Sequence, residues 1–116
     1  MATRTAPYDF IQLDEELGHY NSRRARGVST HLLRQEDGSI ALRYHNTHVL
    51  TFHPDGRVIA HAGGWRSATT KERINRQAVA AVYSRNFEWF ASPIVDGQIS
   101  TEREVPFEDG MDLSAL

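Results

Sequence analysis

Two Asp-Gly pairs, each set between runs of alternating apolar and polar residues, constrain this chain of 116 residues more than any other feature. They are Asp37-Gly38, between residues 28–34 and 39–45, and Asp55-Gly56, between residues 48–53 and 57–62. Asp-Gly between alternating runs is a strong signal for a β-hairpin, because glycine accepts the positive φ that a tight turn requires. We therefore predict two hairpins, with Leu32 opposite Leu42 in the first and Leu50 opposite Ala60 in the second.

The alternation gives the two faces of the second hairpin different chemistry. One face carries Leu50, Phe52, Val58 and Ala60, with His48 and Ala62 at its far end. The other face carries Thr51, His53, Arg57, Ile59 and His61. We expect the apolar face to be covered and the other to face solvent, as in an antiparallel sheet with one buried side.

A helix is predicted from about residue 70 to residue 84. Gly63-Gly64 allow a chain reversal before it, and Thr69 followed by Glu72 has the spacing of a capping box at its start. Its apolar stripe at helical spacing consists of Ile74, Ala78, Ala81 and Val82. We expect this helix to pack on one face of the sheet. The fold class is therefore α+β: a mostly antiparallel sheet of β-hairpins with one helix packed on it.

The flanking segments complete the predicted organisation. Residues 8–20 have the spacing of a short N-terminal helix, and residues 1–6 before it are expected to be frayed. Residues 21–27 are interpreted as a basic linker, so we divide the chain into an N-terminal part, 1–27, and a single small α+β domain, 28–116. Near the C-terminus, a strand at 87–91, a turn at 95–97 and a partner strand at 98–105 are predicted.

Charge is distributed unevenly along the chain. The net charge is −2, but residues 21–85 hold 11 of the 13 basic residues and 4 of the 15 acidic ones. Either the acidic ends pair with the basic centre, or the centre forms a basic surface for an acidic partner. The chain has no cysteine, and no segment reaches the length of a membrane span, so a soluble protein is expected, without membrane association.

Known catalytic patterns are missing from this sequence. It has no Walker-type or Rossmann-type glycine spacing and no G-x-S-x-G motif. His53 and His61 share a face but would lie roughly 13 Å apart at about 3.3 Å per residue. His45 and His48 have no cysteine or nearby carboxylate to complete a metal site. We therefore predict no catalytic residue, no metal and no cofactor, and a protein that is not an enzyme.

The stretch from Gly63 to Asn75 is the best candidate for a binding site. Its basic and aromatic residues surround a predicted helix start, whose free N–H groups favour anions. Together with the nearby corner of the first hairpin, the candidate binding residues are His45, Trp65, Arg66, Lys71, Arg73 and Asn75. A structural interpretation remains open, in which Trp65 is a core aromatic and Lys71 and Asn75 bond to carbonyls of the corner at 45–47.

Three boxes of this chain resemble a family of small proteins encoded by tailed bacteriophages and prophages. The boxes are His45-Asn46-Thr47 within residues 40–52, Gly63-Gly64-Trp65-Arg66, and Thr69-Thr70-Lys71-Glu72-Arg73-Ile74-Asn75. Residues 105–111 are also similar, so that the resemblance covers roughly residues 28–111. The chain departs from it at residues 28–32, where the family tends to have an Asn-Asn-Thr-like stretch. The resemblance implies viral origin and an α+β layout, and it supplies no catalytic residue.

Two functions follow as expectations. The first is a small non-enzymatic binding module, acting in the host cytoplasm through contacts with a host or phage protein or with another copy of itself. An exposed apolar patch from Trp89, Phe90 and Ile94 would suit that role. The alternative is nucleic-acid or nucleotide binding by the basic centre of the chain. Its predicted contacts are Arg23, Arg24, Arg26, Arg66, Lys71, Arg73 and Arg76.

Overall fold

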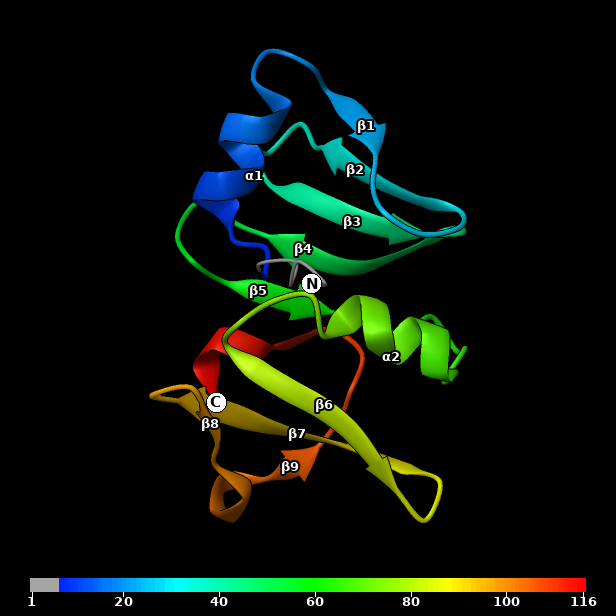
Figure 1. Ribbon diagram of the computed structural model, residues 1–116, viewed down its shortest axis with the longest axis vertical. Helices are drawn as coiled ribbons and strands as arrows, with labels where there is room; N and C mark the ends of the chain where they lie inside the picture. The colour runs from blue at the N-terminus through cyan, green and yellow to red at the C-terminus, as the bar shows by residue number, and fades with distance from the viewer. Residues whose placement is uncertain (1–6) are drawn as a thin grey trace, which may run out of the picture.

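The protein is an α+β fold in which two antiparallel sheets meet, with a short helix between them (Figure 1). The computed structural model describes residues 7–116, so the expected fraying of residues 1–6 lies outside the described part. The helices and strands are α1 (Phe10–Leu17), β1 (Ser22–Arg24), β2 (Thr30–Arg34), β3 (Ile40–Tyr44), β4 (Thr47–Phe52), β5 (Val58–Ala60), α2 (Ala68–Ile74), β6 (Ala80–Arg85), β7 (Glu88–Val95), β8 (Gln98–Ile99), β9 (Val105–Pro106) and β10 (Met111–Asp112). Two short 3-10 helices, Thr101–Arg103 and Leu113–Ala115, follow β8 and β10.

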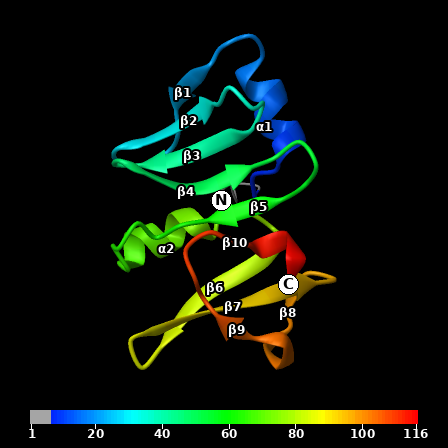
Figure 2. The same cartoon turned by 180° about the vertical axis from the view of Figure 1, so that it is seen from behind.

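The first sheet has the strand order β1-β2-β3-β4-β5-β10, and in the second β6 pairs with β7, which also pairs with β8 and β9. Figure 2 shows the first sheet from behind, with β10 joining it next to β5. The predicted registers are confirmed: Leu32 pairs with Leu42, and Leu50 pairs with Ala60. The α+β class with mostly antiparallel pairing is therefore confirmed as well.

A β-bulge between β3 and β4 places His48 on the face of the sheet opposite to the predicted one. Leu42 pairs with Leu50, but the next pair is Arg43 with His48, so that Val49 is the extra residue. A bulge reverses the alternation on its far side. Val49 is consequently buried in the core, whereas His48 shares the face of Arg43, opposite to the predicted one.

The predicted helix over 70–84 is wrong in its second half, because α2 ends at Ile74 and residues 80–85 form β6. Two amide side chains take over the backbone groups that a longer helix would have bonded. Asn75 exchanges two hydrogen bonds with the backbone of Val82, both 2.8 Å long. The buried Gln77 accepts from the N–H groups of Val79 and Ala80 and donates to the carbonyls of Ile74 and Ala80.

Three smaller predictions also need correction. The basic linker contains β1, which pairs with the edge of β2. Residues 98–105 do not form one strand but β8, a 3-10 turn and β9, of which only β9 and β8 pair with β7. The helix α2 begins at a different cap: Ser67 accepts from the N–H of Thr70 at 3.1 Å, and Glu72 bonds to Arg76 rather than back to Thr69.

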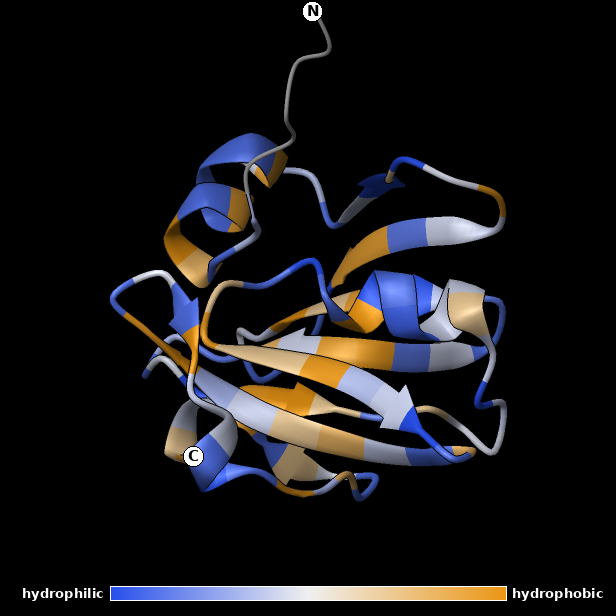
Figure 3. Cartoon of the chain, turned by 60° about the horizontal axis from the view of Figure 1, so that its bottom comes forward, coloured by the Kyte–Doolittle hydropathy of each residue, from blue (hydrophilic) through white to orange (hydrophobic). Residues whose placement is uncertain are grey.

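One hydrophobic core joins both sheets and both helices. Leu32, Leu42 and Leu50 on the inner face of the first sheet are fully buried, in one cluster with Leu13 of α1 and Ile74 of α2. The same cluster takes in the second sheet through a set of residues that comprises Val82, Trp89, Ala91 and Phe107. Figure 3 shows hydrophobic stretches along the strands and mostly hydrophilic colours on α2. Among residues 7–116, no helix is long and apolar enough to cross a membrane.

Candidate functional site

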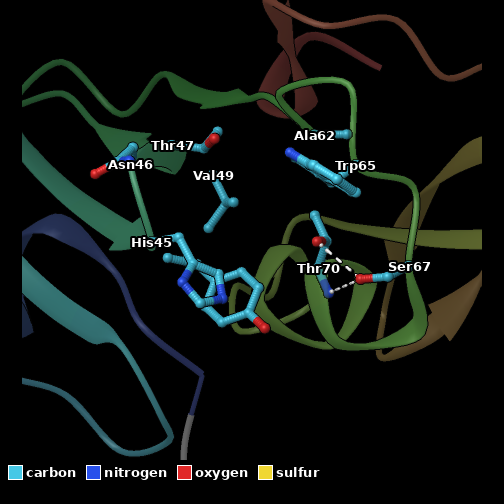
Figure 4. Close-up of a pocket in the computed structure, with 9 residues that line it drawn as sticks. His45, Asn46, Thr47, Val49, Ala62, Trp65, Ser67 and Thr70 are labelled. Atoms are coloured by element: carbon cyan, nitrogen blue, oxygen red, sulfur yellow. Dashed lines mark hydrogen bonds between the residues drawn. The ribbon is translucent and has the colours of Figure 1, made fainter.

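An open cleft of about 440 Å³ lies where the corner between β3 and β4 faces the loop that leads into α2 (Figure 4). It is lined by Tyr44, His45, Asn46, Thr47, Val49, Ala62, Trp65, Ser67 and Thr70. Each of the three boxes on which the phage resemblance is based contributes at least one lining residue, and Ala62 and Ser67 lie between them. Segments that lie up to 26 positions apart in the sequence, from Tyr44 to Thr70, thus form one surface.

One wall of the cleft depends on the close approach of Gly63 to Thr47. Gly63 has φ 65°, and a Cβ at this position would overlap the hydroxyl of Thr47. The carboxylate of Asp109 holds the same turn from the C-terminal segment, accepting from the N–H of Ala62 at 2.8 Å and of Gly63 at 3.2 Å. The side chains of Asp109 and Thr47 therefore fix the backbone at the base of the loop that carries Trp65.

The opposite wall is the corner at His45. His45 has φ 54°, and its N–H donates to the carbonyl of Ser29 at 2.9 Å. The neighbouring Tyr44 ring lies 4.3 Å from the imidazole, centroid to centroid, and carries the guanidinium of Arg73 at 4.8 Å from its own centroid. Arg73 is buried and donates to the hydroxyl of Thr30 at 3.1 Å, so it supports this wall from α2.

Cationic side chains attach the Trp65 loop and α2 to the second sheet. Arg66 lies over the rings of Trp89 and Phe107, at 5.5 and 5.4 Å from their centroids. Lys71 lies 5.5 Å from the Trp89 centroid and donates to Ser84 at 2.8 Å. Cation–π contacts of this kind contribute about 0.5–2 kcal/mol each. Arg66 and Lys71 thus hold the cleft in place rather than line it.

The cleft itself is neutral and partly apolar. Its described lining contains no Asp, Glu, Lys or Arg, and its hydrogen-bonding groups are the hydroxyls, the Asn46 amide, the imidazole and the indole. Val49 and Ala62 supply aliphatic surface between them. Trp65 is 75% exposed, so the interpretation of this residue as a core aromatic is wrong.

The six predicted binding residues fall into two groups. His45 and Trp65 line the cleft. Arg66, Lys71, Arg73 and Asn75 surround it and are engaged with other parts of the fold. The predicted bonds from Lys71 and Asn75 to the corner at 45–47 do not form, because both residues bond to β6.

Several lining residues were not predicted as site residues. Asn46 and Thr47 follow His45 in the predicted corner, so their position in the cleft could have been inferred from that of His45. Tyr44 lies at the end of β3, directly before His45, whereas Ser67 and Thr70 reach the cleft through the packing of α2. The predicted patch at Trp89, Phe90 and Ile94 does not form, because Trp89 is buried and the other two are half-buried.

The side chain of Arg76 links the end of α2 to the N-terminal loop. Arg76 is buried and donates to Glu72 at 2.8 Å and to the carbonyl of Arg26 at 2.7 Å. The hydrogen bond from Arg76 lowers the pKa of Glu72. Within residues 7–116, no three His, Asp or Glu side chains come together as a metal-binding group would.

The fold and the cleft define a small α+β protein with an open, tryptophan-rimmed pocket between its first sheet and the loop that leads into α2. Residues 17–114 match the Kyanoviridae Gp96 protein family. The chain belongs to this family of phage proteins. Comparisons with curated proteins and with solved structures found no match.

Proposed function

We propose that the chain is a non-enzymatic binding module of a phage, and that the cleft beside Trp65 receives a side chain of a partner protein. The observation that carries this proposal is the exposed indole at the rim of a cleft that the fold builds from three distant segments. Exposed tryptophans at the mouth of a pocket are typical anchors of protein–protein contacts.

The chemistry of the cleft favours a neutral, largely apolar side chain of the partner. Aliphatic and aromatic surface from Val49, Ala62 and Trp65 favours an apolar group. Hydroxyl, amide and imidazole groups around it suit a neutral polar rim, as in the hydrogen-bonded border of an interface. A charged side chain would be desolvated here without an opposite charge, which is costly.

The residues predicted for nucleic-acid binding mostly serve the fold. Arg73 and Arg76 are buried, and Arg66 and Lys71 lie on the Trp89 ring. Arg23 pairs with Glu16 at 3.0 Å. These cations therefore do not form the continuous basic surface on which a polyanion would depend, and the alternative is not favoured at this site.

Affinity capture with matched variants tests the proposal. The wild-type chain, Trp65→Ala and Phe87→Ala are immobilised and exposed to nuclease-treated lysate of the phage's host. Phe87 is also a fully exposed aromatic residue, but it lies in the turn between β6 and β7. We expect the wild type and Phe87→Ala to retain the same host or phage proteins. Trp65→Ala should retain at least about tenfold less of them, the loss typical of an interface anchor.

The folding of the variants is checked by thermal unfolding. Both substitutions remove exposed rings, so each should change the free energy of unfolding by no more than about 0.5 kcal/mol. Retention of the same proteins by all three immobilised proteins would show that Trp65 is not the anchor. Sedimentation of the wild type alone distinguishes binding to a second copy from binding to a host protein.

A further inference from the structure

A row of cationic and imidazole side chains crosses the outer face of the first sheet, away from the cleft and from both helices. Residues directly opposite each other in antiparallel strands share a face. Arg24 on β1 is opposite His31, which is opposite Arg43, which is opposite His48 across the bulge. His61 follows Ile59 by two positions and so extends this set on the same face.

A second row runs parallel to the first on the same face. It consists of Leu33, Ala41, Thr51 and Ile59, paired strand by strand from β2 to β5. Where the strands are regular, two positions along a strand separate the rows by roughly 6.6 Å, and neighbouring strands are about 4.8 Å apart. The face thus offers a basic strip some 19 Å long beside an apolar strip.

Two carboxylates at the margin of the basic row keep their negative charge and are hydrogen-bonded to other groups. Asp112 lies opposite Ile59 at the end of the apolar row, and its carboxylate accepts from the N–H of Val58 and from Ser114. Asp109 is occupied by two backbone N–H groups of the cleft loop. Within the described chain, His31 Nδ1 and Arg43 Nε are buried atoms that make no hydrogen bond. Because both atoms are buried, a ligand on this face would reach these two side chains only through their other nitrogens.

From these two rows we infer that the outer face of the first sheet binds single-stranded nucleic acid. Phosphates would lie along Arg24, His31, Arg43, His48 and His61. Bases would lie over Leu33, Thr51 and Ile59, which are half-buried, whereas Ala41 is fully buried. A nucleotide strand has a charged edge and a planar edge, so it matches the two rows better than an acidic peptide does. The second row contains no aromatic ring, so the bases would contact aliphatic side chains and not stack on rings. This inference uses none of the cleft residues and is independent of the function proposed above.

Protonation should strengthen this binding. Burial, together with the nearby Arg43 and His61, lowers the pKa of His48. Arg43 is opposite His48, His61 also acts on it, and His31 and Arg24 lie further along the row. Asp109 bonds to the backbone of Ala62, next to His61, and Asp112 lies opposite Ile59. A bound phosphate favours the protonated imidazole and raises its pKa, so protons are taken up on binding. Affinity should therefore rise as the pH falls from 8 to 6.

Neighbouring arginines on the edge strand supply the decisive pair of variants. Arg24 lies on the proposed face, whereas Arg23 is opposite Leu32 and lies on the other face. Both are exposed, so Arg24→Gln and Arg23→Gln remove the same charge without disturbing the core. Binding is measured by fluorescence anisotropy with a labelled oligothymidine of about eight nucleotides, within the range that single-strand binders cover.

We expect Arg24→Gln to weaken binding about three- to tenfold at low salt and to reduce the slope of log affinity against log salt by about 0.7. Arg23→Gln should stay within about twofold of wild type, since its charge lies on the other face. His48→Gln should flatten the pH dependence between 6 and 8. Equal losses in the two arginine variants, no binding at low salt, or equal binding of a duplex or of polyglutamate would overturn the inference.

Discussion

Gly63 shows how a single missing side chain gives the cleft its shape. The turn approaches Thr47 so closely that a Cβ would overlap the threonine hydroxyl, and its φ of 65° lies in the left-handed region. The adjacent Gly64 also has a positive φ, 81°, but a Cβ there would meet nothing within 4 Å. The two glycines therefore separate the cost of backbone conformation from the cost of steric overlap.

Alanine at each glycine tests this separation. Gly64→Ala should lower the free energy of unfolding by about 1–2 kcal/mol, because alanine disfavours the left-handed backbone conformation. Gly63→Ala should cost at least about 1 kcal/mol more, because the new methyl group must displace Thr47. Urea unfolding of both variants measures the difference. Equal costs would mean that the approach of Gly63 to Thr47 is not a constraint.

At the scale of elements, the sequence predicts the strand pairs better than it predicts α2. The Asp-Gly turns set the registers of both early strand pairs, because turn geometry and alternation are local. Alanine-rich residues 78–82 fit a helical stripe as well as an alternating strand. The choice depends on side-chain bonds from Asn75 and Gln77 to the backbone, which apolar periodicity does not reveal. The bulge at Val49 is likewise invisible in the alternation, which is why His48 was assigned to the wrong face.

The start of α2 can be tested by removing one hydroxyl at a time. Ser67 caps the helix by accepting from the N–H of Thr70. Ser67→Ala should therefore lower the free energy of unfolding by about 1 kcal/mol. Thr69→Ala, at the cap that the sequence predicts, should change it by no more than about 0.5 kcal/mol, because Thr69 is exposed. Chemical denaturation measures both; a larger loss for Thr69→Ala would contradict the observed cap.

At the scale of the molecule, the cleft and the basic row lie on different sides of the first sheet. The inner face packs on both helices and on the second sheet, and the cleft opens at the border of that packing. The outer face carries half-buried side chains such as His31, Arg43 and Ile59 and takes no part in that packing. The candidate residues Trp65 and His45 were predictable from their positions beside turns, whereas their meeting in one cleft depends on the packing of α2.

The two tryptophans of the chain make the role of the cleft directly measurable. Trp89 is 5% exposed and Trp65 is 75% exposed. In a Trp89→Phe variant, Trp65 is the single indole, and acrylamide should quench its fluorescence strongly in the free protein. When a protein retained by wild type in the capture experiment is added, we expect the Trp65 emission to shift to the blue and its quenching to fall. An indole that stays equally accessible to acrylamide in the complex would contradict the proposal that the cleft is the binding site.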